Sequence, residues 1–259
     1  MISPQTSSAQ PREKRHFDKE VDLNANVDLP QEEGIYKIKG RPDLKMQVFV
    51  YRAKPTPSPT LALSCNLPDS DSSEVVAGAG WKLPSAWVYR LNTGSVPSSV
   101  GSQNLPTIAD NSYGVWKSAI SNKVSITRGP NTSVDKARRD GQNIIAWGKA
   151  PASALAVSYI LYYPSTGLAA EVDTIMNQNF AWAWSNPVSW KTQQGTTCAY
   201  KNVYDAQDIL THELGHTMGL DDEYTDSFAN NTMYGYGSKT ETKKDTLTSG
   251  DKAGVSALY

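Results

Sequence analysis

The apolar residues of the chain repeat with the period of a strand in several stretches of its first two thirds. KMQVFVYR, residues 45 to 52, alternates between apolar and polar positions and predicts a strand. Short strands are also predicted in WKLPSAWVYRLN (81–92), KVSI (123–126) and NIIAWG (143–148). The longer runs ALAVSYILYY and LAAEVDTIMN flank the turn sequence PSTG, so residues 154–177 are expected to form a β-hairpin.

Helical spacing of apolar residues appears in three other stretches. LPTIADNSYGVWKSAI (105–120) has apolar residues at helical intervals. DAQDILTHELGHTM follows as a helix with Asp205 as N-cap, and Gly219 stands where helices commonly end. In the last stretch, LTSGDKAGVSALY, Thr248 and Asp251 have the spacing of a capping box. Strands and helices in this order predict an α+β fold.

A change of composition divides the chain near Gly80. Residues 1–34 are polar and charged with little periodicity, which is typical of a flexible or weakly folded segment, and AKPTPSPT (53–60) has the composition of a Pro-rich spacer. We therefore expect a leader or pro-region over residues 1–79 and one main domain over residues 80–259.

The charge balance excludes two classes of partner. The chain has 25 basic and 26 acidic residues and a formal net charge of -1, so no overall positive field attracts nucleic acid or an anionic membrane. The apolar run at 154–163 is about half as long as a membrane-spanning helix requires. No nucleic-acid or membrane partner is therefore expected.

Two of the three histidines lie four residues apart in THELGHTMGLDDEY, residues 211 to 224. On a helix, residues four apart differ by about 40° in direction, so His212 and His216 point the same way and can bind one metal ion. Glu213 between them completes an HExxH motif, in which two imidazoles bind zinc and the carboxylate takes a proton from a zinc-bound water. The chemistry indicated is peptide hydrolysis, with Zn²⁺ as the cofactor.

A third metal ligand is expected after the helix ends. The turn at Gly219 brings back Asp222, six residues after His216, and this spacing favours Asp222 over the neighbouring carboxylates Asp221 and Glu223. Met233 follows in TMYGYG, where it could form a tight turn beneath the metal. In another class of zinc sites the helix continues and a downstream glutamate binds the metal.

Glu241 is the candidate for that alternative, but it lies in the polar stretch SKTETKKDT. Gly219 argues against a longer helix, so HExxHxxGxxD is the favoured ligand pattern.

At these residues the sequence resembles the metzincin metallopeptidases, and in its HExxHxxGxxD form it is similar to the snapalysins. The resemblance assigns His212, His216 and Asp222 to the zinc, Glu213 to the general base and Met233 to the Met-turn. WKLPSAWVYRLN, EVDTIMN and LTSGDKAGVSALY look like the matrixin branch, so the resemblance covers about residues 80–259. It implies a metzincin-like domain with a twisted, mostly parallel sheet, one antiparallel edge strand, an active-site helix and a C-terminal helix.

The chain departs from the matrixins at two points. Matrixins normally have a third histidine where Asp222 stands, and a carboxylate ligand would reduce the net charge of the metal site. Animal matrixins hold a structural zinc through several histidines, but His16 is the one histidine left for it here. Calcium would be another way to stabilise the domain, although no stretch of the sequence identifies a calcium loop.

The two cysteines, Cys65 and Cys198, have three interpretations. A disulfide between them would close a loop of more than 100 residues and contribute about 4–5 kcal/mol in the chain-entropy model. SCNLPD (64–69) instead resembles the matrixin cysteine switch, in which a thiolate keeps the zymogen latent. Two unrelated buried thiols are the third interpretation; the disulfide is favoured because it gives both residues a role.

On the substrate side, the resemblance makes Tyr234 and Tyr236 candidates for an apolar pocket wall, with plain packing as the alternative. It also implies that the strand before the zinc helix pairs with substrate, for which LAAEVDTIMN is the candidate. The expected function is a secreted, monomeric endopeptidase acting on proteins or peptides, its signal peptide already removed. The alternative is a catalytically weak zinc-binding or adhesive module that uses the aromatic run NFAWAWSNPVSW (179–190).

Overall fold

The computed structural model describes residues 16–23, 29–55, 70–186, 200 and 202–259. Most of the strands form one mixed sheet with the order β1-β2-β3-β7-β8-β6-β4-β5, and β11 pairs with β3 off this path. Two further short strands, β9 (Trp182–Ala183) and β10 (Tyr204–Asp205), pair with each other. The strands of the main sheet are β1 (His16–Val21), β2 (Gly34–Ile38), β3 (Arg41–Ala53), β4 (Ala86–Leu91), β5 (Ser125–Arg128), β6 (Asn143–Gly148), β7 (Ala154–Tyr163), β8 (Leu168–Asn177) and β11 (Tyr236–Gly237).

The part of the sheet formed after residue 80 has the predicted topology. Strands β5, β4, β6 and β8 run parallel to one another, and β7 pairs antiparallel with β8 at the end of this series. The hairpin predicted around PSTG is confirmed, since β7 and β8 are joined by residues 164–167. The mostly parallel arrangement is therefore confirmed for this part of the chain, but the antiparallel strand β7 is not the expected edge strand, because β3 pairs with its other side.

The leader strands continue the same sheet beyond β7. Strand β3 pairs antiparallel with β7 from Lys45–Tyr162 to Arg52–Ala154, so β7 has a neighbour on each side. Strand β2 then pairs antiparallel with β3, and β1 pairs parallel with β2. The first 34 residues, expected to be weakly folded, thus already contain β1 and the start of β2. The domain division at residue 80 stays a prediction.

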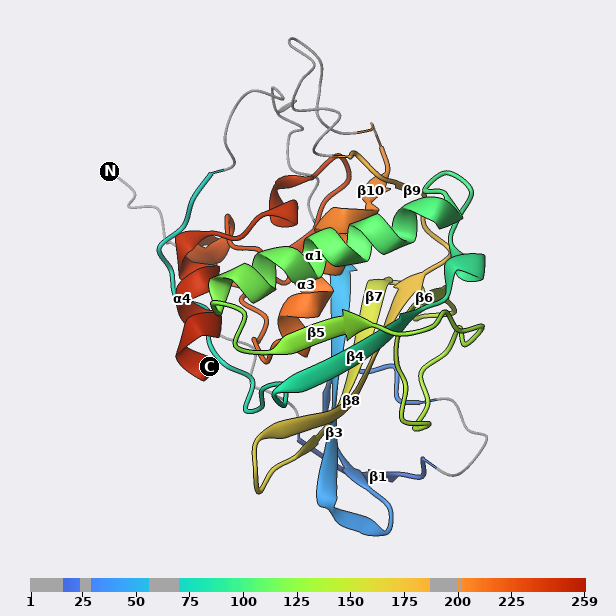
Figure 1. The fold of residues 1–259 in the computed structure, drawn as a ribbon, viewed down its shortest axis with the longest axis vertical. Helices are drawn as coiled ribbons and strands as arrows, with labels where there is room; N and C mark the ends of the chain where they lie inside the picture. Colours follow the sequence, from blue (N-terminus) through green and yellow to red (C-terminus); the bar gives the residue numbers. More distant parts are fainter. Residues whose placement is uncertain (1–15, 24–28, 56–69, 187–199, 201) are drawn as a thin grey trace, which may run out of the picture.

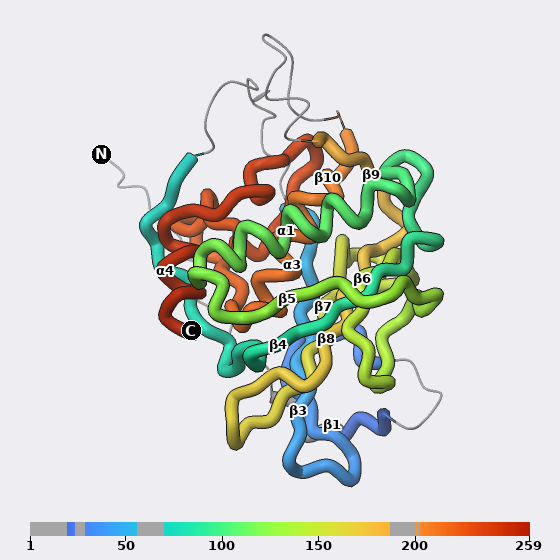
Figure 2. The backbone as a smooth tube through the Cα atoms, viewed as in Figure 1, coloured from blue at the N-terminus to red at the C-terminus, as the bar shows by residue number. Residues whose placement is uncertain are grey.

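Three α-helices occupy the described chain at the predicted places: α1 (Leu105–Ala119), α3 (Ala206–Thr217) and α4 (Ser249–Leu258). Helices α1 and α3 lie next to each other on one side of the sheet, and α4 packs beside them (Figures 1 and 2). Four short 3-10 helices stand in the connections: Thr93–Ser95, Ser102–Asn104, Asp226–Phe228 and Lys243–Asp245. Because the sheet and α1 both pack against α3, this helix lies in the interior of the protein.

The hydrophobic core divides into clusters on the two faces of the sheet, and β3 contributes to both. Because successive side chains of a strand point to opposite faces, Phe49 and Tyr51 lie in the large cluster under the helices. Val48 and Val50 lie in a second cluster with side chains of β2 and β7. All four side chains are buried, so β3 is held on both faces.

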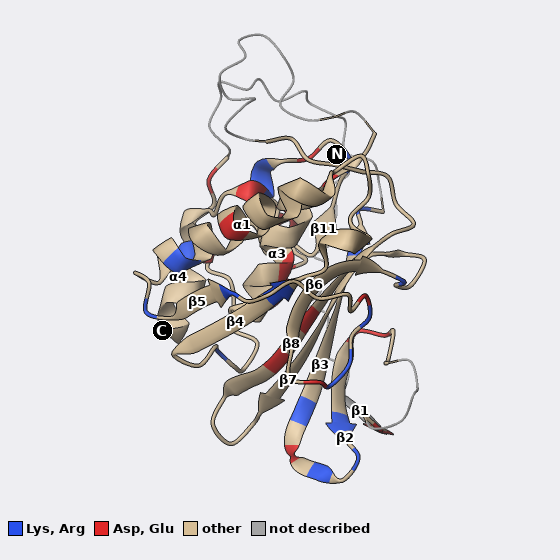
Figure 3. Ribbon diagram, turned by 45° about the vertical axis from the view of Figure 1, so that its right-hand side comes forward, with Lys and Arg blue, Asp and Glu red and all other residues tan. Residues whose placement is uncertain are grey.

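Charged side chains of both signs are spread over the described chain (Figure 3). At the β2–β3 end of the sheet, Lys39 pairs with Asp22 and Arg41 pairs with Asp43. Among the described residues, no helix is long and apolar enough to cross a membrane. These observations add nothing in favour of a nucleic-acid or membrane partner.

The start and end of α3 are fixed by the residues predicted for them. The Asp205 carboxylate accepts hydrogen bonds from the backbone N–H groups of Gln207 and Asp208, at 2.9 and 3.0 Å, and from Ser185 N–H at 2.6 Å. At the other end Gly219 has φ +102°, and a Cβ there would lie 2.1 Å from the carbonyl oxygen of Trp81. Both the left-handed conformation and this close approach require glycine.

We expect Asp205→Ala to reduce the free energy of unfolding by about 1–2 kcal/mol, since the buried amides at the start of α3 lose their acceptor. Asp205→Asn keeps a side-chain oxygen and should cost less than half as much. Denaturant unfolding followed by circular dichroism measures both changes. Equal losses in the two variants would show that the cap is not the source of the effect.

Candidate metal centre

Helix α3 carries its functional side chains in the interior of the protein. All twelve of its residues are buried, and His212, Glu213 and His216 are 0% exposed. The indole Nε1 of Trp116, on α1, donates to the carbonyl oxygen of Thr211 at 2.8 Å and ties the two helices together. Side chains on this helix therefore have little freedom to move.

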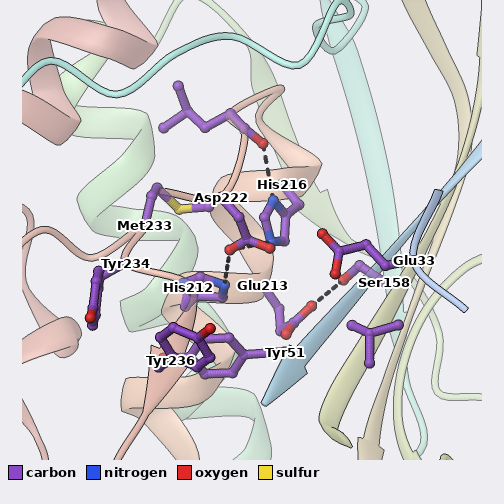
Figure 4. Close-up of polar contacts among 12 residues, drawn as sticks. Glu33, Tyr51, Ser158, His212, Glu213, His216, Asp222, Met233, Tyr234 and Tyr236 are labelled. Carbon is purple, nitrogen blue, oxygen red and sulfur yellow. Dashed lines mark hydrogen bonds and ion pairs between the residues drawn. The ribbon is translucent and has the colours of Figure 1, made fainter. Parts of the chain in front are cut away.

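The side chains of His212, His216 and Asp222 converge on one point (Figure 4). Each offers one nitrogen or oxygen atom, and these atoms all lie within 4.8 Å of one another. Asp222 Oδ1 is 3.2 Å from His212 Nε2 and 3.6 Å from His216 Nε2. The structure thus brings together the three residues that the spacing of the motif favours.

Hydrogen bonds at the far sides of the two rings decide which nitrogen faces the centre unprotonated. His212 Nδ1 lies 2.8 Å from the carbonyl oxygen of Thr232, and His216 Nδ1 lies 3.0 Å from that of Leu220. A carbonyl oxygen only accepts, so each Nδ1 carries a hydrogen, and in the neutral form of each ring the Nε2 lone pair faces Asp222.

These lone pairs and the Asp222 carboxylate would repel one another in a buried site unless a cation lay between them. His212 Nε2 and Asp222 Oδ1 both lack a partner with hydrogen-bond geometry. Burial acts to raise the pKa of Asp222, whereas the positive charge of His216 and His212 in their protonated forms lowers it below its usual value. Two imidazoles and a carboxylate are a donor set typical of Zn²⁺, and the residues fit such an ion.

The carboxylates that compete with Asp222 in the sequence point elsewhere. Glu223 Oε1 accepts from the backbone N–H of Ala77 at 3.2 Å, and Glu241 Oε2 accepts from that of Ser238 at 2.9 Å. Within the described part of the chain, the cluster that could hold a metal comprises His212, His216 and Asp222. Because α3 ends at Thr217, a ligand pattern that needs a longer helix is not supported.

Glu213 lies beside the centre, directed toward strand β7. Its Oε2 accepts a hydrogen bond of 2.5 Å from the Ser158 hydroxyl, while Oε1 has no hydrogen-bond partner. Burial raises the pKa of Glu213 to about 8, and the bond from Ser158 acts in the opposite direction. Ser158 was not identified from the sequence, where a serine in an apolar strand gives no signal of such a contact.

Met233 forms part of the floor of the centre. It is 0% exposed, and its Sδ would lie 2.1 Å from a Cβ added at Gly215 on α3. The backbone N–H groups of Thr232 and Met233 donate to the Asp251 carboxylate at 2.8 and 3.2 Å. Asp251, predicted as a helix cap, therefore also holds the turn whose Thr232 carbonyl positions His212.

Tyr234 and Tyr236 follow this turn, with ring centroids 5.7 Å apart. Tyr234 is buried, and Tyr236 is half-buried in β11, which pairs with β3. Their carbonyl oxygens accept hydrogen bonds from the Lys244 ammonium, at 3.1 and 2.7 Å respectively. Their assignment as walls of a substrate pocket stays a prediction.

One expectation about substrate binding is wrong. The candidate substrate strand, LAAEVDTIMN, is β8, which pairs with β7 on one side and β6 on the other and so has no free edge. In the aromatic run at 179–190, Trp182 is 2% exposed and packs edge-on against Trp147, so this part belongs to the core, and a binding role for an exposed portion of the run stays a prediction. Residues 187–190 of the run lie outside the described residues.

None of the three interpretations of the cysteines is tested, because Cys65 and Cys198 lie outside the described residues. Phe49, Tyr51 and Lys244 also contact the centre or its surroundings, and their role is not apparent from the sequence. Alternating aromatic residues in KMQVFVYR were read as a strand, and a single lysine in a polar stretch gave no sign that it would be buried.

Residues 151–259 match the matrixin family model of metallopeptidases. This segment contains α3, Asp222, Met233 and α4, and therefore all three candidate metal ligands. No curated protein matches the chain.

The fold and the match over residues 151–259 support a matrixin-like metzincin, so the resemblance seen in the sequence is confirmed at this level. Matrixins are zinc metallopeptidases, and a metallopeptidase is the class of protein supported here. The closer similarity to the snapalysins stays a prediction.

We expect Asp251→Ala to reduce the free energy of unfolding by about 3 kcal/mol, since it leaves buried N–H groups of the Met233 turn without an acceptor. Asp71→Ala is the control, because Asp71 also accepts from the start of α4, at Ser249 N–H, but is exposed. Its cost should stay below about 1 kcal/mol. Chemical denaturation measures both, and similar losses would contradict the role given to Asp251.

Proposed function

We propose that the protein is a zinc-dependent endopeptidase in which His212, His216 and Asp222 bind the metal and Glu213 is the general base. The observation that carries the proposal is the convergence of two imidazole lone pairs and a carboxylate in a site with no exposed atoms on either histidine. Matrixin similarity over residues 151–259 supports the metallopeptidase class, and the finer assignment rests on this geometry.

The surrounding groups would hold the proposed ligands in position. The Thr232 and Leu220 carbonyls fix the direction of the two rings, and such contacts make the ligating nitrogen more basic. The Tyr224 hydroxyl donates to Asp222 Oδ2 at 3.1 Å, which leaves Oδ1 directed to the centre. Bound there, zinc would supply a Lewis acid for the scissile carbonyl and a water of lowered pKa.

Glu213 would move the proton in this reaction. Its free Oε1 is placed to take a proton, while the Ser158 hydroxyl holds Oε2 and keeps the carboxylate oriented. Once Glu213 has taken this proton, the burial that raises its pKa favours the protonated form, and the carboxyl group could then pass the proton to the leaving amine. The mechanism requires no further acid in the site.

Proteins or extended peptides are the proposed substrates, and the enzyme is proposed to be secreted and monomeric, as its similarity to the matrixins favours. The alternative is a zinc-binding protein with weak catalysis, since an aspartate ligand lowers the net charge of the metal site. Zinc content and proteolysis, measured separately, distinguish the two.

Purified protein should bind one zinc ion, and His212→Ala and Asp222→Ala should each reduce zinc occupancy by at least about tenfold. Asp221→Ala is the matched control, because it removes the adjacent carboxylate and should leave occupancy unchanged. Elemental analysis after dialysis measures the zinc content. Loss of zinc in Asp221→Ala together with retention in Asp222→Ala would overturn the assigned ligand.

Zinc-loaded protein should degrade casein, and Glu213→Ala should lower the rate by about 10²–10⁴-fold while keeping its zinc, because the general base is removed. Intact mass recorded throughout the incubation identifies the active form, whole or shortened by loss of the leader. If neither the full-length nor the shortened wild-type protein cleaves casein when loaded with zinc, the endopeptidase assignment fails.

A further inference from the structure

Glu213 is fully buried on the same helix as the two candidate histidine ligands, but it does not belong to the described cluster that could hold a metal. Beside burial, the charge of Asp222 acts to raise the pKa of Glu213, so the two carboxylates lie close together. A carboxylate is itself a common zinc ligand. What keeps Glu213 out of the cluster is therefore decided by the contacts of its carboxylate.

Ser158 on β7 is the residue toward which this carboxylate points (Figure 4). The Ser158 hydroxyl donates to Glu213 Oε2 at 2.5 Å, while Oε1 has no hydrogen-bond partner. Helix α3 packs on β7, so the bond joins the helix that carries the candidate ligands to the sheet beneath it. Among the described residues, the carboxylate is thus held through one oxygen and by one hydroxyl.

A second hydroxyl lies directly behind the first. Thr174 on β8 is opposite Ser158 in the antiparallel β7–β8 ladder, and the two hydroxyl oxygens are 3.1 Å apart. A serine hydroxyl has one hydrogen, which Ser158 gives to Glu213, so toward Thr174 its oxygen can only accept. The hydrogen bonds therefore run from Thr174 to Ser158 to Glu213. Bonds in such a chain polarise and strengthen one another.

The two hydroxyls stand on an otherwise apolar face of the sheet. Ser158 and Thr174 are 0% and 1% exposed, and their neighbours two positions along the strands belong to the large hydrophobic cluster, among them Ile160, Val172 and Met176. Burying a hydroxyl costs free energy unless it is hydrogen-bonded. Packing alone would favour aliphatic side chains here, so the bond to Glu213 is the feature that accounts for the pair.

We propose that Ser158 and Thr174 are positioning residues that hold the Glu213 carboxylate off the metal, so that it remains a base and does not become a fourth protein ligand. A catalytic zinc site keeps one position open for water, and a fourth protein ligand would fill it. Without the Ser158 hydroxyl, the buried carboxylate would find its partner in the bound cation. The effect on turnover rests on the proposed function, but the restraint is measurable without catalysis.

Cobalt in place of zinc tests the restraint by spectroscopy. Co²⁺ takes the same nitrogen and oxygen ligands, and its visible absorption depends on their number and geometry. Metal-free full-length protein is loaded with Co²⁺, and Ser158→Ala should change the spectrum relative to wild type. Thr174→Val should change it in the same direction, because Ser158 loses its donor, whereas Thr174→Ser keeps a hydroxyl and should retain the wild-type spectrum.

Removal of Glu213 distinguishes positioning from general loosening of the site. Glu213→Ala and Glu213→Ala/Ser158→Ala should give identical Co²⁺ spectra, since no carboxylate is left to bind the metal. A spectral change by Ser158→Ala that persists in the Glu213→Ala background would overturn the proposal. Wild type that takes up no Co²⁺ would overturn the metal centre itself, and the positioning role with it.

Ser112→Ala is the matched control. Ser112 is also fully buried and accepts a hydrogen bond of 2.9 Å from Thr211 of α3, so this change removes a hydroxyl that contacts the same helix but not Glu213. Its Co²⁺ spectrum should be that of wild type, with circular dichroism as the check that each variant is folded. A wild-type spectrum in folded Ser158→Ala contradicts the proposal. If that variant does not fold, a wild-type spectrum in the isosteric Thr174→Val contradicts it equally.

Turnover measures the consequence for the base. With the zinc-loaded form that cleaves casein, Ser158→Ala should lower kcat about tenfold with KM little changed, because a hydrogen bond that orients a charged group is lost. Thr174→Val should lower kcat about fivefold, and Ser112→Ala should leave it unchanged. An unchanged kcat in Ser158→Ala would overturn the link to the base. The expected spectra without casein cleavage by wild type would support the restraint but count against the peptidase assignment.

Discussion

One constraint governs the rest of the structure: two imidazole nitrogens and one carboxylate oxygen must be held close together in a buried site. The Nε2 atoms of His212 and His216 and Oδ1 of Asp222 lie within 4.8 Å of one another, and all three residues of the cluster are buried. Such an arrangement costs free energy unless a cation is present, so the rest of the fold must hold the three groups against their repulsion. In return the site is preorganised for a metal, and the protein need not rearrange when the ion binds.

The support comes from segments far apart in the sequence. The turn at Gly219 brings Asp222 back toward α3, and the Thr232 carbonyl holds the His212 ring. That carbonyl is positioned in turn by Asp251 of α4, which binds the backbone of Thr232 and Met233. A change at the C-terminal helix is therefore expected to act on the metal centre even though α4 has no ligand.

Strand β3 has two roles in the fold: it packs into the hydrophobic core, and it covers the candidate centre. Phe49 and Tyr51 fill the space above the histidines and belong to the large hydrophobic cluster. One strand thus belongs to the hydrophobic core and at the same time stacks on both histidines of the candidate centre.

The sequence by itself determined the local elements and the candidate ligands. The 3.6-residue and 2-residue periods, Asp205, Gly219 and the Thr248–Asp251 pair placed helices and strands close to where they lie, because these signals act between neighbours in the chain. The HExxHxxGxxD spacing selected three residues that the fold does bring together. Only the tertiary structure decided that β3 pairs with β7 and that Lys244 donates a hydrogen bond to Tyr51, since these contacts join residues more than 100 positions apart. It also placed β8 between β6 and β7 in the middle of the sheet, although this strand was expected to pair with substrate. The periodicity of the sequence indicates which residues are buried, but it does not indicate which strands pair with each other.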